Sequence, residues 1–122
     1  MTKLQFPEYS FDVRKSGDVQ QIFDRTRRKW LVMTPEEHVR QVVVEYVVNA
    51  LGYPRSLLSL ERSLKLSGMS RRADIVIFSR SGRPVMVIEC KRPTVAIDRS
   101  VFDQAARYNL VFGVSHIVVT NG

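Results

Sequence analysis

Two apolar segments separated by a short turn constrain the fold more than any other feature of the chain. Residues 73–78 and 84–90 are rich in Val and Ile, and the segment between them, Ser79-Arg80-Ser81-Gly82-Arg83, is typical of a turn. The pattern predicts a pair of antiparallel strands in which Phe78 faces Val85. Because polar residues occur only at the ends of both segments, we expect two central strands that are buried on both faces.

A helix is expected before the hairpin, from Thr34 to about Gly52. Thr34 is a capping residue, Pro35 suits the first helical position, and two carboxylates follow near the positive end of the helix dipole. Apolar residues then recur at helical spacing until Gly52, which is a typical terminator. The many valines favour a strand by propensity, but they do not alternate with polar residues, so the spacing indicates a helix.

Other segments complete a mixed sheet flanked by helices. The expected elements are a strand at 57–66, a helix from 98 or 100 to 112, and a strand at 116–120. Ser100 and Asp103 have the spacing of a capping box at the start of the second helix. Residues 1–33 predict two or three short strands. We therefore expect an α/β (α+β) fold in one compact domain, with a β-rich extension at 1–33 and a core at 34–122.

The charge of the chain favours a polyanionic partner. Its 19 Lys and Arg residues against 12 Asp and Glu leave a formal net charge of +7, which favours nucleic acid, although positive charge also serves solubility. The single cysteine, Cys90, permits no internal disulfide and is typical of a reducing compartment, so we expect a cytoplasmic location. No apolar run is long enough for a signal peptide or a membrane span, which predicts no association with a membrane.

Three ionisable residues end the apolar hairpin and are candidates for a functional site. The expected pairing places Asp74 opposite Glu89. Residues that face each other across antiparallel strands share one side of the sheet, with Cβ atoms within about 5.5 Å. Lys91 follows Glu89 by two positions and therefore points to the same side. Two carboxylates and an ammonium group are thus expected at one end of the sheet.

The paired carboxylates point to a divalent metal. Two neighbouring carboxylates repel each other unless a cation lies between them, and their hard oxygen atoms suit Mg²⁺ or Mn²⁺. Such an ion would polarise a phosphate and lower the pKa of a bound water, while Lys91 orients or activates that water. The simpler alternative is an ion pair among Asp74, Glu89 and Lys91 that serves the fold alone.

Asp74 and the segment Glu89-Cys90-Lys91, with 14 residues between them, resemble the signature of PD-(D/E)xK nucleases. The resemblance implies a restriction-endonuclease-like core in which Asp74 and Glu89 bind the metal and Lys91 assists catalysis. It also implies that Cys90 contributes its backbone carbonyl to the metal while its side chain points to the packed face. We expect a structural thiol there rather than a nucleophile. Ala73 stands where the family name has a proline, which is a common variation.

Residues on the two predicted helices add to the resemblance. Gln104 and Tyr108 match a QxxxY motif that follows ExK in nucleases related to type I restriction R subunits. The motif implies that both face the site and position DNA or the lysine; the alternative is a surface glutamine and a core tyrosine. Glu36 lies on the apolar stripe of the first helix, and the resemblance implies that it completes the metal site, with Glu37 as second choice. Their charges also suit a helix N-terminus without any such role.

Longer stretches resemble the N-terminal nuclease domain of type I restriction enzyme R subunits. They lie within residues 34–122 and include Leu51-Gly52-Tyr53-Pro54, Arg72-Ala73-Asp74-Ile75-Val76 and Gln104-Ala105-Ala106-Arg107-Tyr108-Asn109. The chain carries no GxxxxGK[ST] loop, so we expect neither an ATP-driven motor nor a complete R subunit. Because the sequence ends directly after a predicted strand, a C-terminal remainder is expected.

The resemblance implies a metal-dependent DNA nuclease of a restriction-modification or DNA-processing system, with Mg²⁺ or Mn²⁺ as cofactor. Its expected partners are DNA and other subunits of a restriction system. The candidates for phosphate contacts, each of which also suits a solvated surface, are Arg71, Arg72, Arg92 and Arg107. The alternative function is a nucleic-acid-binding or interaction module that has the nuclease fold but cleaves little on its own.

Overall fold

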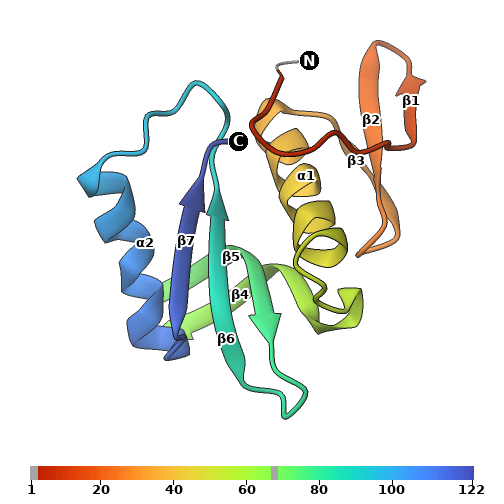
Figure 1. Cartoon of the computed structure of the whole chain (residues 1–122). Coiled ribbons are helices and arrows are strands. Elements are labelled where there is room, and N and C mark those ends of the chain that lie inside the picture. The colour runs from red at the N-terminus through yellow and green to blue at the C-terminus, as the bar shows by residue number, and fades with distance from the viewer. Residues whose placement is uncertain (1–2, 67–68) are drawn as a thin grey trace.

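The predicted hairpin forms the centre of the structure. The computed structural model describes residues 3–66 and 69–122, with side chains described for all of these except 63–66, 69–71 and 108–112. β5 (Met69–Phe78) pairs antiparallel with β6 (Pro84–Cys90), and both have a further strand on their outer side. The predicted central position of the two strands is therefore confirmed (Figure 1).

The register of the hairpin differs from the prediction next to the turn. Phe78 faces Pro84 rather than Val85, so the predicted pair is wrong. The reason is that the turn closes on Ser79, whose N–H donates to the carbonyl of Arg83 at 2.8 Å. Pairing therefore begins one residue earlier on β6, and Val85 is left over as a bulge. Beyond the bulge the two strands follow the predicted register.

The sheet is mixed and lies between two helices, as predicted. β4 (Leu58–Leu66) pairs antiparallel with β5, and β7 (His116–Thr120) pairs parallel with β6, so the strand order is β4-β5-β6-β7. α1 (Pro35–Asn49) and α2 (Arg99–Phe112) lie on opposite sides of this sheet in Figure 1. The α+β architecture expected from the sequence is present.

Thr34 caps α1 as its position before Pro35 predicts. The Oγ1 atom of Thr34 accepts a hydrogen bond from the backbone N–H of Glu37 at 3.0 Å, which satisfies one of the free donors of the first turn. After the helix, Gly52 has a φ of 79°, a left-handed value that glycine adopts without strain. A short 3₁₀ helix, η1 (Arg55–Leu57), then leads into β4.

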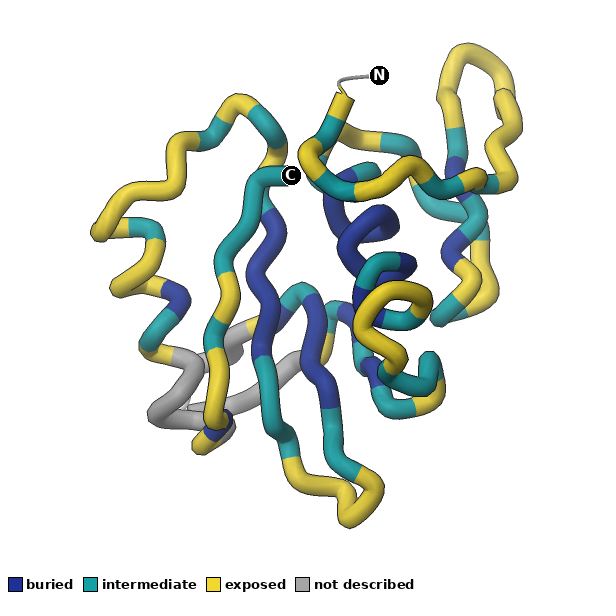
Figure 2. The backbone as a smooth tube through the Cα atoms, in the orientation of Figure 1, coloured by how far each residue is buried: buried dark blue, intermediate teal, exposed yellow. Residues whose placement is uncertain are grey.

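The main core lies between α1 and one face of the sheet. Its buried members from the helix and from β5 and β6 are Val39, Val43, Val44, Val47, Ile75, Ile77, Ile88 and Cys90. On the opposite face, Val76 and Val87 pack with Val114 and Ile117. Figure 2 shows that burial is concentrated in α1, β5 and β6, so these three elements form a rigid platform for any residue at their ends.

The start of α2 corrects one prediction. The helix begins at Arg99, and the carboxylate of Asp98 accepts a hydrogen bond from the backbone N–H of Val101 at 2.9 Å. Asp98 therefore caps the helix, and the predicted capping box of Ser100 and Asp103 is wrong because Ser100 already lies within the first turn.

The N-terminal extension forms the predicted short strands in a separate sheet. β1 (Val13–Ser16), β2 (Val19–Asp24) and β3 (Lys29–Val32) pair antiparallel in that order. Ile22 and Asp24 on β2 are fully buried, so the extension packs against the rest of the chain. Across residues 3–66 and 69–122, none of the helices has the length and apolar character needed to cross a membrane.

Candidate active site

Asp74 in β5 and Glu89 in β6 lie next to each other across the central hairpin. The backbone N–H of Asp74 donates to Oε1 of Glu89 at 3.4 Å, and the backbone N–H of Cys90 donates to Oδ2 of Asp74 at 2.7 Å. Each carboxylate therefore reaches the backbone of the opposite strand. The structure brings together the two residues that the register predicts as a pair.

Burial and the charge of Asp74 give Glu89 an unusual ionisation. Glu89 is only 7% exposed. Burial raises the pKa of Glu89 to about 8 and the charge of Asp74 adds to this rise, while a backbone hydrogen bond and the charge of Lys91 oppose it. Lys91 is half-buried and lies directly beyond the end of β6. Its backbone N–H donates to the carbonyl of Thr120 at 2.8 Å. The ammonium group of Lys91 thus acts on Glu89 through its charge. The side of the sheet to which it points stays a prediction.

The thiol of Cys90 lies on the packed face of β6. It is fully buried in the core formed with the valines of α1. Burial raises the pKa of Cys90 well above its usual value, and the charge of Asp74 raises it further. The side chain therefore lies on the packed face, as expected, and its structural role stays a prediction. The contact between its backbone carbonyl and a metal stays a prediction.

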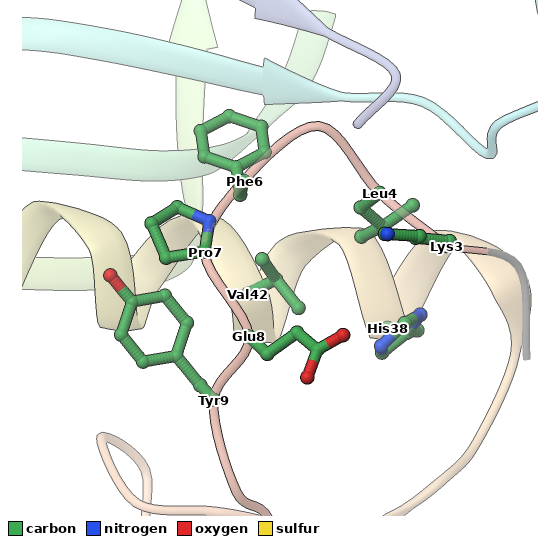
Figure 3. Close-up of a pocket in the computed structure, with 8 residues that line it drawn as sticks. All are labelled: Lys3, Leu4, Phe6, Pro7, Glu8, Tyr9, His38 and Val42. Atoms are coloured by element: carbon green, nitrogen blue, oxygen red, sulfur yellow. The ribbon is translucent and has the colours of Figure 1, made fainter.

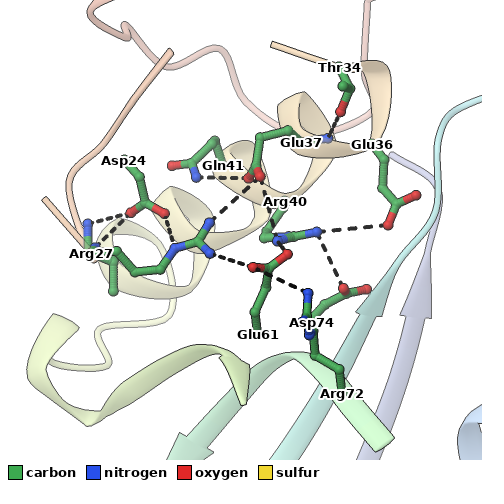
Figure 4. A network of polar contacts seen from close by, with 11 residues as sticks. Asp24, Arg27, Thr34, Glu36, Glu37, Arg40, Gln41, Glu61, Arg72 and Asp74 are labelled. Carbon is green, nitrogen blue, oxygen red and sulfur yellow. Dashed lines mark hydrogen bonds and ion pairs between the residues drawn. The ribbon is translucent and has the colours of Figure 1, made fainter. Parts of the chain in front are cut away.

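Arg40, on α1, is a residue of this site for which the sequence pattern predicts no role. Its side chain is 6% exposed, and its Nη2 atom lies 3.4 Å from Oδ1 of Asp74 and 3.8 Å from Oε1 of Glu36. On the other edge, Nη1 donates a hydrogen bond of 2.8 Å to Glu61 and lies 3.6 Å from Glu37. Figure 4 shows the guanidinium group among these four carboxylates. Burial by itself would lower the pKa of Arg40, but the charge of Glu37 and the hydrogen bond to Glu61 raise it, so the group stays a cation.

The two candidate glutamates on α1 have different surroundings. Glu37 is buried, accepts a hydrogen bond from Gln41 at 3.1 Å, and lies 3.6 Å from Nη2 of Arg27. Glu36 has a side chain that is 47% exposed and shares Nη2 of Arg40 with Asp74. Of the two, Glu36 is therefore the one that shares a nitrogen of Arg40 with Asp74. Its place in a metal site stays a prediction.

The carboxylates around Asp74 determine whether a divalent metal fits this site. Within the described part of the chain, no three His, Cys, Asp or Glu side chains are grouped closely enough to hold a metal ion together. The structure therefore does not join Glu36 to Asp74 and Glu89, because Arg40 stands between Glu36 and Asp74. Two carboxylates remain, and these fit Mg²⁺, which commonly takes one or two carboxylates and completes its shell with waters and substrate phosphates.

The two residues of the QxxxY motif both belong to α2. Gln104 is exposed, and among the described side chains no contact joins it to Asp74, Glu89 or Lys91. The side chain of Tyr108 lies outside the described residues. Their roles toward the site therefore stay predictions.

The arginines that are predicted to contact phosphates differ in their relation to the network around Asp74. Arg72 is exposed and its Nη1 atom lies 3.9 Å from Oε2 of Glu61, which also binds Arg40. Arg92 and Arg107 are exposed, and the side chain of Arg71 lies outside the described residues. Of the three arginines whose side chains are described, Arg72 is the one that shares an ion-pair partner, Glu61, with Arg40.

A separate hollow lies between the N-terminal segment and the outer face of α1. It has a volume of about 350 Å³, and residues that line it include Leu4, Phe6, Tyr9, His38 and Val42 (Figure 3). Burial lowers the pKa of His38, which favours a neutral side chain. None of the candidate catalytic residues lines this hollow, so it does not belong to the site at Asp74.

Part of the chain matches a family of known proteins. The family model for the type I restriction enzyme R protein N terminus (HSDR_N) matches residues 35–122, from the first residue of α1 to the last residue of the chain. No curated protein matches the chain. The matched range contains every residue proposed above for the site, and it leaves out the N-terminal extension.

Proposed function

The chain belongs to the family of type I restriction enzyme R protein N termini, and from this membership we propose that it is a metal-dependent nuclease that hydrolyses the phosphodiester bonds of DNA. The observation that carries the proposal is the contact between Asp74, within β5, and Glu89, near the end of β6, with the charge of Lys91 acting on Glu89. Burial and the charge of Asp74 raise the pKa of Glu89, so ionisation of the pair costs stability unless a cation offsets it.

In this proposal each residue of the hairpin has a distinct task. Asp74 and Glu89 would hold Mg²⁺ or Mn²⁺, which when bound supplies a Lewis acid for the phosphate and lowers the pKa of a water. The backbone N–H of Cys90 fixes one oxygen of Asp74, so that carboxylate is oriented in advance. Lys91 orients the attacking water and offsets the negative charge that develops in the transition state.

The remaining candidates are proposed as supports around this centre. Glu36, on the far side of Arg40 from Asp74, is the further carboxylate proposed from α1, and the backbone carbonyl of Cys90 would be a further ligand. Gln104 and Tyr108 would position DNA or Lys91. Phosphate contacts are proposed for Arg71, Arg72, Arg92 and Arg107. DNA and other subunits of a restriction system are the proposed partners.

The test is a plasmid-cleavage assay with Mg²⁺ or Mn²⁺, comparing the wild type with Asp74→Ala and Lys91→Ala. We expect both substitutions to reduce cleavage by about 10²-fold or more, as the loss of groups that act in the transition state does. The matched controls are Asp103→Ala and Lys15→Ala, because both side chains are exposed and lie in α2 and β1. Circular dichroism confirms that each variant is folded.

The result also decides on the alternative function. Cleavage that survives both substitutions would mean that another site, or a contaminant, is responsible. A wild type that binds DNA in a salt-dependent way and never cleaves it would instead support a binding module, which the net charge of +7 also favours.

A further inference from the structure

On the edge away from Asp74, Arg40 belongs to a network of ion pairs that begins in the N-terminal extension. Arg27, which follows β2, pairs with the buried carboxylate of Asp24 at 2.6 Å and donates to Oε2 of Glu61 at 2.9 Å. The other oxygen of Glu61 accepts from Nη1 of Arg40 at 2.8 Å. One carboxylate thus joins two arginines, and the guanidinium group of Arg40 is fixed in place (Figure 4).

The opposite edge of the guanidinium group faces two of the proposed metal ligands. Nη2 lies 3.4 Å from Asp74 and 3.8 Å from Glu36, which are ion-pair distances rather than well-formed hydrogen bonds. The Nε atom is buried and makes no hydrogen bond to any described atom. What Arg40 supplies to Asp74 and Glu36 is therefore mainly its charge.

We propose that Arg40 sets the affinity of the carboxylate pair for a divalent cation by keeping a fixed positive charge beside Asp74. This inference rests on the proposed function and adds a residue that controls how readily the site is loaded. A cation held by Asp74 and Glu89 shares Asp74 with the guanidinium group, and the two positive charges repel each other. Salt screens this repulsion only weakly, because the guanidinium group is buried. The protein without DNA therefore binds the cation weakly, and the negative phosphate of DNA strengthens cation binding.

Two simpler roles of Arg40 predict different results. If Arg40 only stabilised the fold, its removal would lower the stability and leave the metal affinity unchanged. If it mainly oriented Asp74, its removal would weaken metal binding. Loss of a repelling charge strengthens metal binding instead, so the sign of the change separates the three roles.

The test is calorimetric titration of the full chain with Mn²⁺ in the absence of DNA. We expect Arg40→Gln to bind Mn²⁺ at least about tenfold more tightly than the wild type, since the repulsion between such close charges in a buried site exceeds this factor. Arg40→Lys keeps the charge and should stay within about threefold of the wild type. Arg40→Met, which fills the buried space without a polar group, should reproduce the gain if Arg40→Gln does not fold.

Arg55→Gln is the matched control. Arg55 also pairs with a buried glutamate, Glu45, at 2.6 Å, but that pair does not include Asp74. This variant should lose stability without a change in Mn²⁺ affinity. The double variant Asp74→Asn with Arg40→Gln should not show the increased Mn²⁺ affinity. The reason is that the ion is expected to bind at Asp74, and not to the other carboxylates that lose their partner when Arg40 is replaced.

The outcomes separate this inference from the proposed function. Unchanged or weaker binding by the Arg40 variants, or a gain that persists after Asp74→Asn, overturns the role of Arg40. In that case the proposed function still holds if the wild type binds Mn²⁺ and this binding depends on Asp74. If neither the wild type nor the Arg40 variants bind Mn²⁺, the metal site itself is refuted, and the inference with it.

Discussion

Both oxygens of Asp74 have a partner, and the regular ladder opens at this residue. Its neighbours by register are Glu61 on β4 and Glu89 on β6, yet neither pair belongs to the ladder, although the pairs formed by Ile75 do. Glu61 has a φ of 51°, a left-handed value that is rare outside glycine. Strained backbone of this kind concentrates at functional sites. At this opening Arg40 lies against both Glu61 and Asp74.

Replacement of Glu89 by Gln should stabilise the metal-free protein at high pH. The pKa of Glu89 is raised from 4.5 to about 8, so between these values the folded protein holds a proton that the unfolded chain has released. Stability of the wild type therefore falls as the pH rises through this window. In EDTA at pH 8.5 we expect Glu89→Gln to be more stable by on the order of 2 kcal/mol, measured by urea denaturation, with the difference vanishing near pH 4.5.

The control for this experiment is Glu8→Gln, because Glu8 is exposed and its neutralisation should leave the pH dependence unchanged. A Glu89→Gln variant that is less stable than the wild type at pH 8.5 would show that the buried carboxylate is not a cost to the fold. Addition of Mn²⁺ should stabilise the wild type and leave Glu89→Gln nearly unaffected, since binding to the folded state is what shifts the equilibrium.

The sequence predicts the pair of Asp74 and Glu89 because strand register is a matter of counting residues from a turn. Arg40 shows the limit of this reasoning. Its ion pair with Glu36 follows from a spacing of four on a helix, but its contact with Asp74 depends on how α1 packs across β5. Packing of one element on another leaves no periodic signal in the sequence, so a cation that approaches from the helix could not be predicted.

At the scale of elements, the cap of α1 should matter for stability. Thr34 Oγ1 accepts from the N–H of Glu37, and Thr34→Ala removes this acceptor. We expect a loss of about 1 kcal/mol in the free energy of unfolding, measured by urea denaturation. Thr34→Ser keeps the hydroxyl group and should remain near the wild type. Equal losses in both variants would show that the hydroxyl group does not cap the helix.

The bounds of β6 and β7 agree with the prediction because turn residues and a change in apolar content mark both ends. Other bounds and local details differ, and β5 begins at Met69 rather than at residue 73. Phe78 pairs with Pro84, since the hydrogen bond that closes the turn fixes the register there. Asp98 rather than Ser100 caps α2. Several side chains near such an end can cap it, and the path of the incoming loop decides which one does.

For the molecule as a whole, the predicted boundary near residue 34 is crossed by buried ion pairs. The family match begins at residue 35, close to that boundary. Arg27, in the extension, nevertheless contacts Glu37 on α1 and Glu61 on β4. The extension therefore takes part in fixing Arg40.

Glu45 provides a second link between the extension and the core, and its pH dependence can be predicted. The side chain is 3% exposed and lies 3.2 Å from Arg25 and 2.6 Å from Arg55. Burial would raise the pKa of Glu45, but hydrogen bonds and charges from Arg55 and Arg25 outweigh burial and lower it below 4.5. As the pH falls, the unfolded chain takes up a proton first. The stabilisation is thus complete above about pH 4.5 and is lost as the pH falls through the lowered pKa of the folded state.

Glu45→Gln should therefore cost stability at neutral pH and progressively less in acid. At pH 7 we expect a loss of roughly 2–3 kcal/mol, the range for hydrogen bonds to a charged group, and the gap should narrow below about pH 4 in urea denaturation. Asp103→Asn is the control, because Asp103 pairs with Arg99 in an exposed position, with side chains 62% and 93% exposed. Such a pair contributes little. Equal losses from both substitutions would mean that the buried link does not hold the extension to the core, since Glu45, unlike Asp103, contacts the extension.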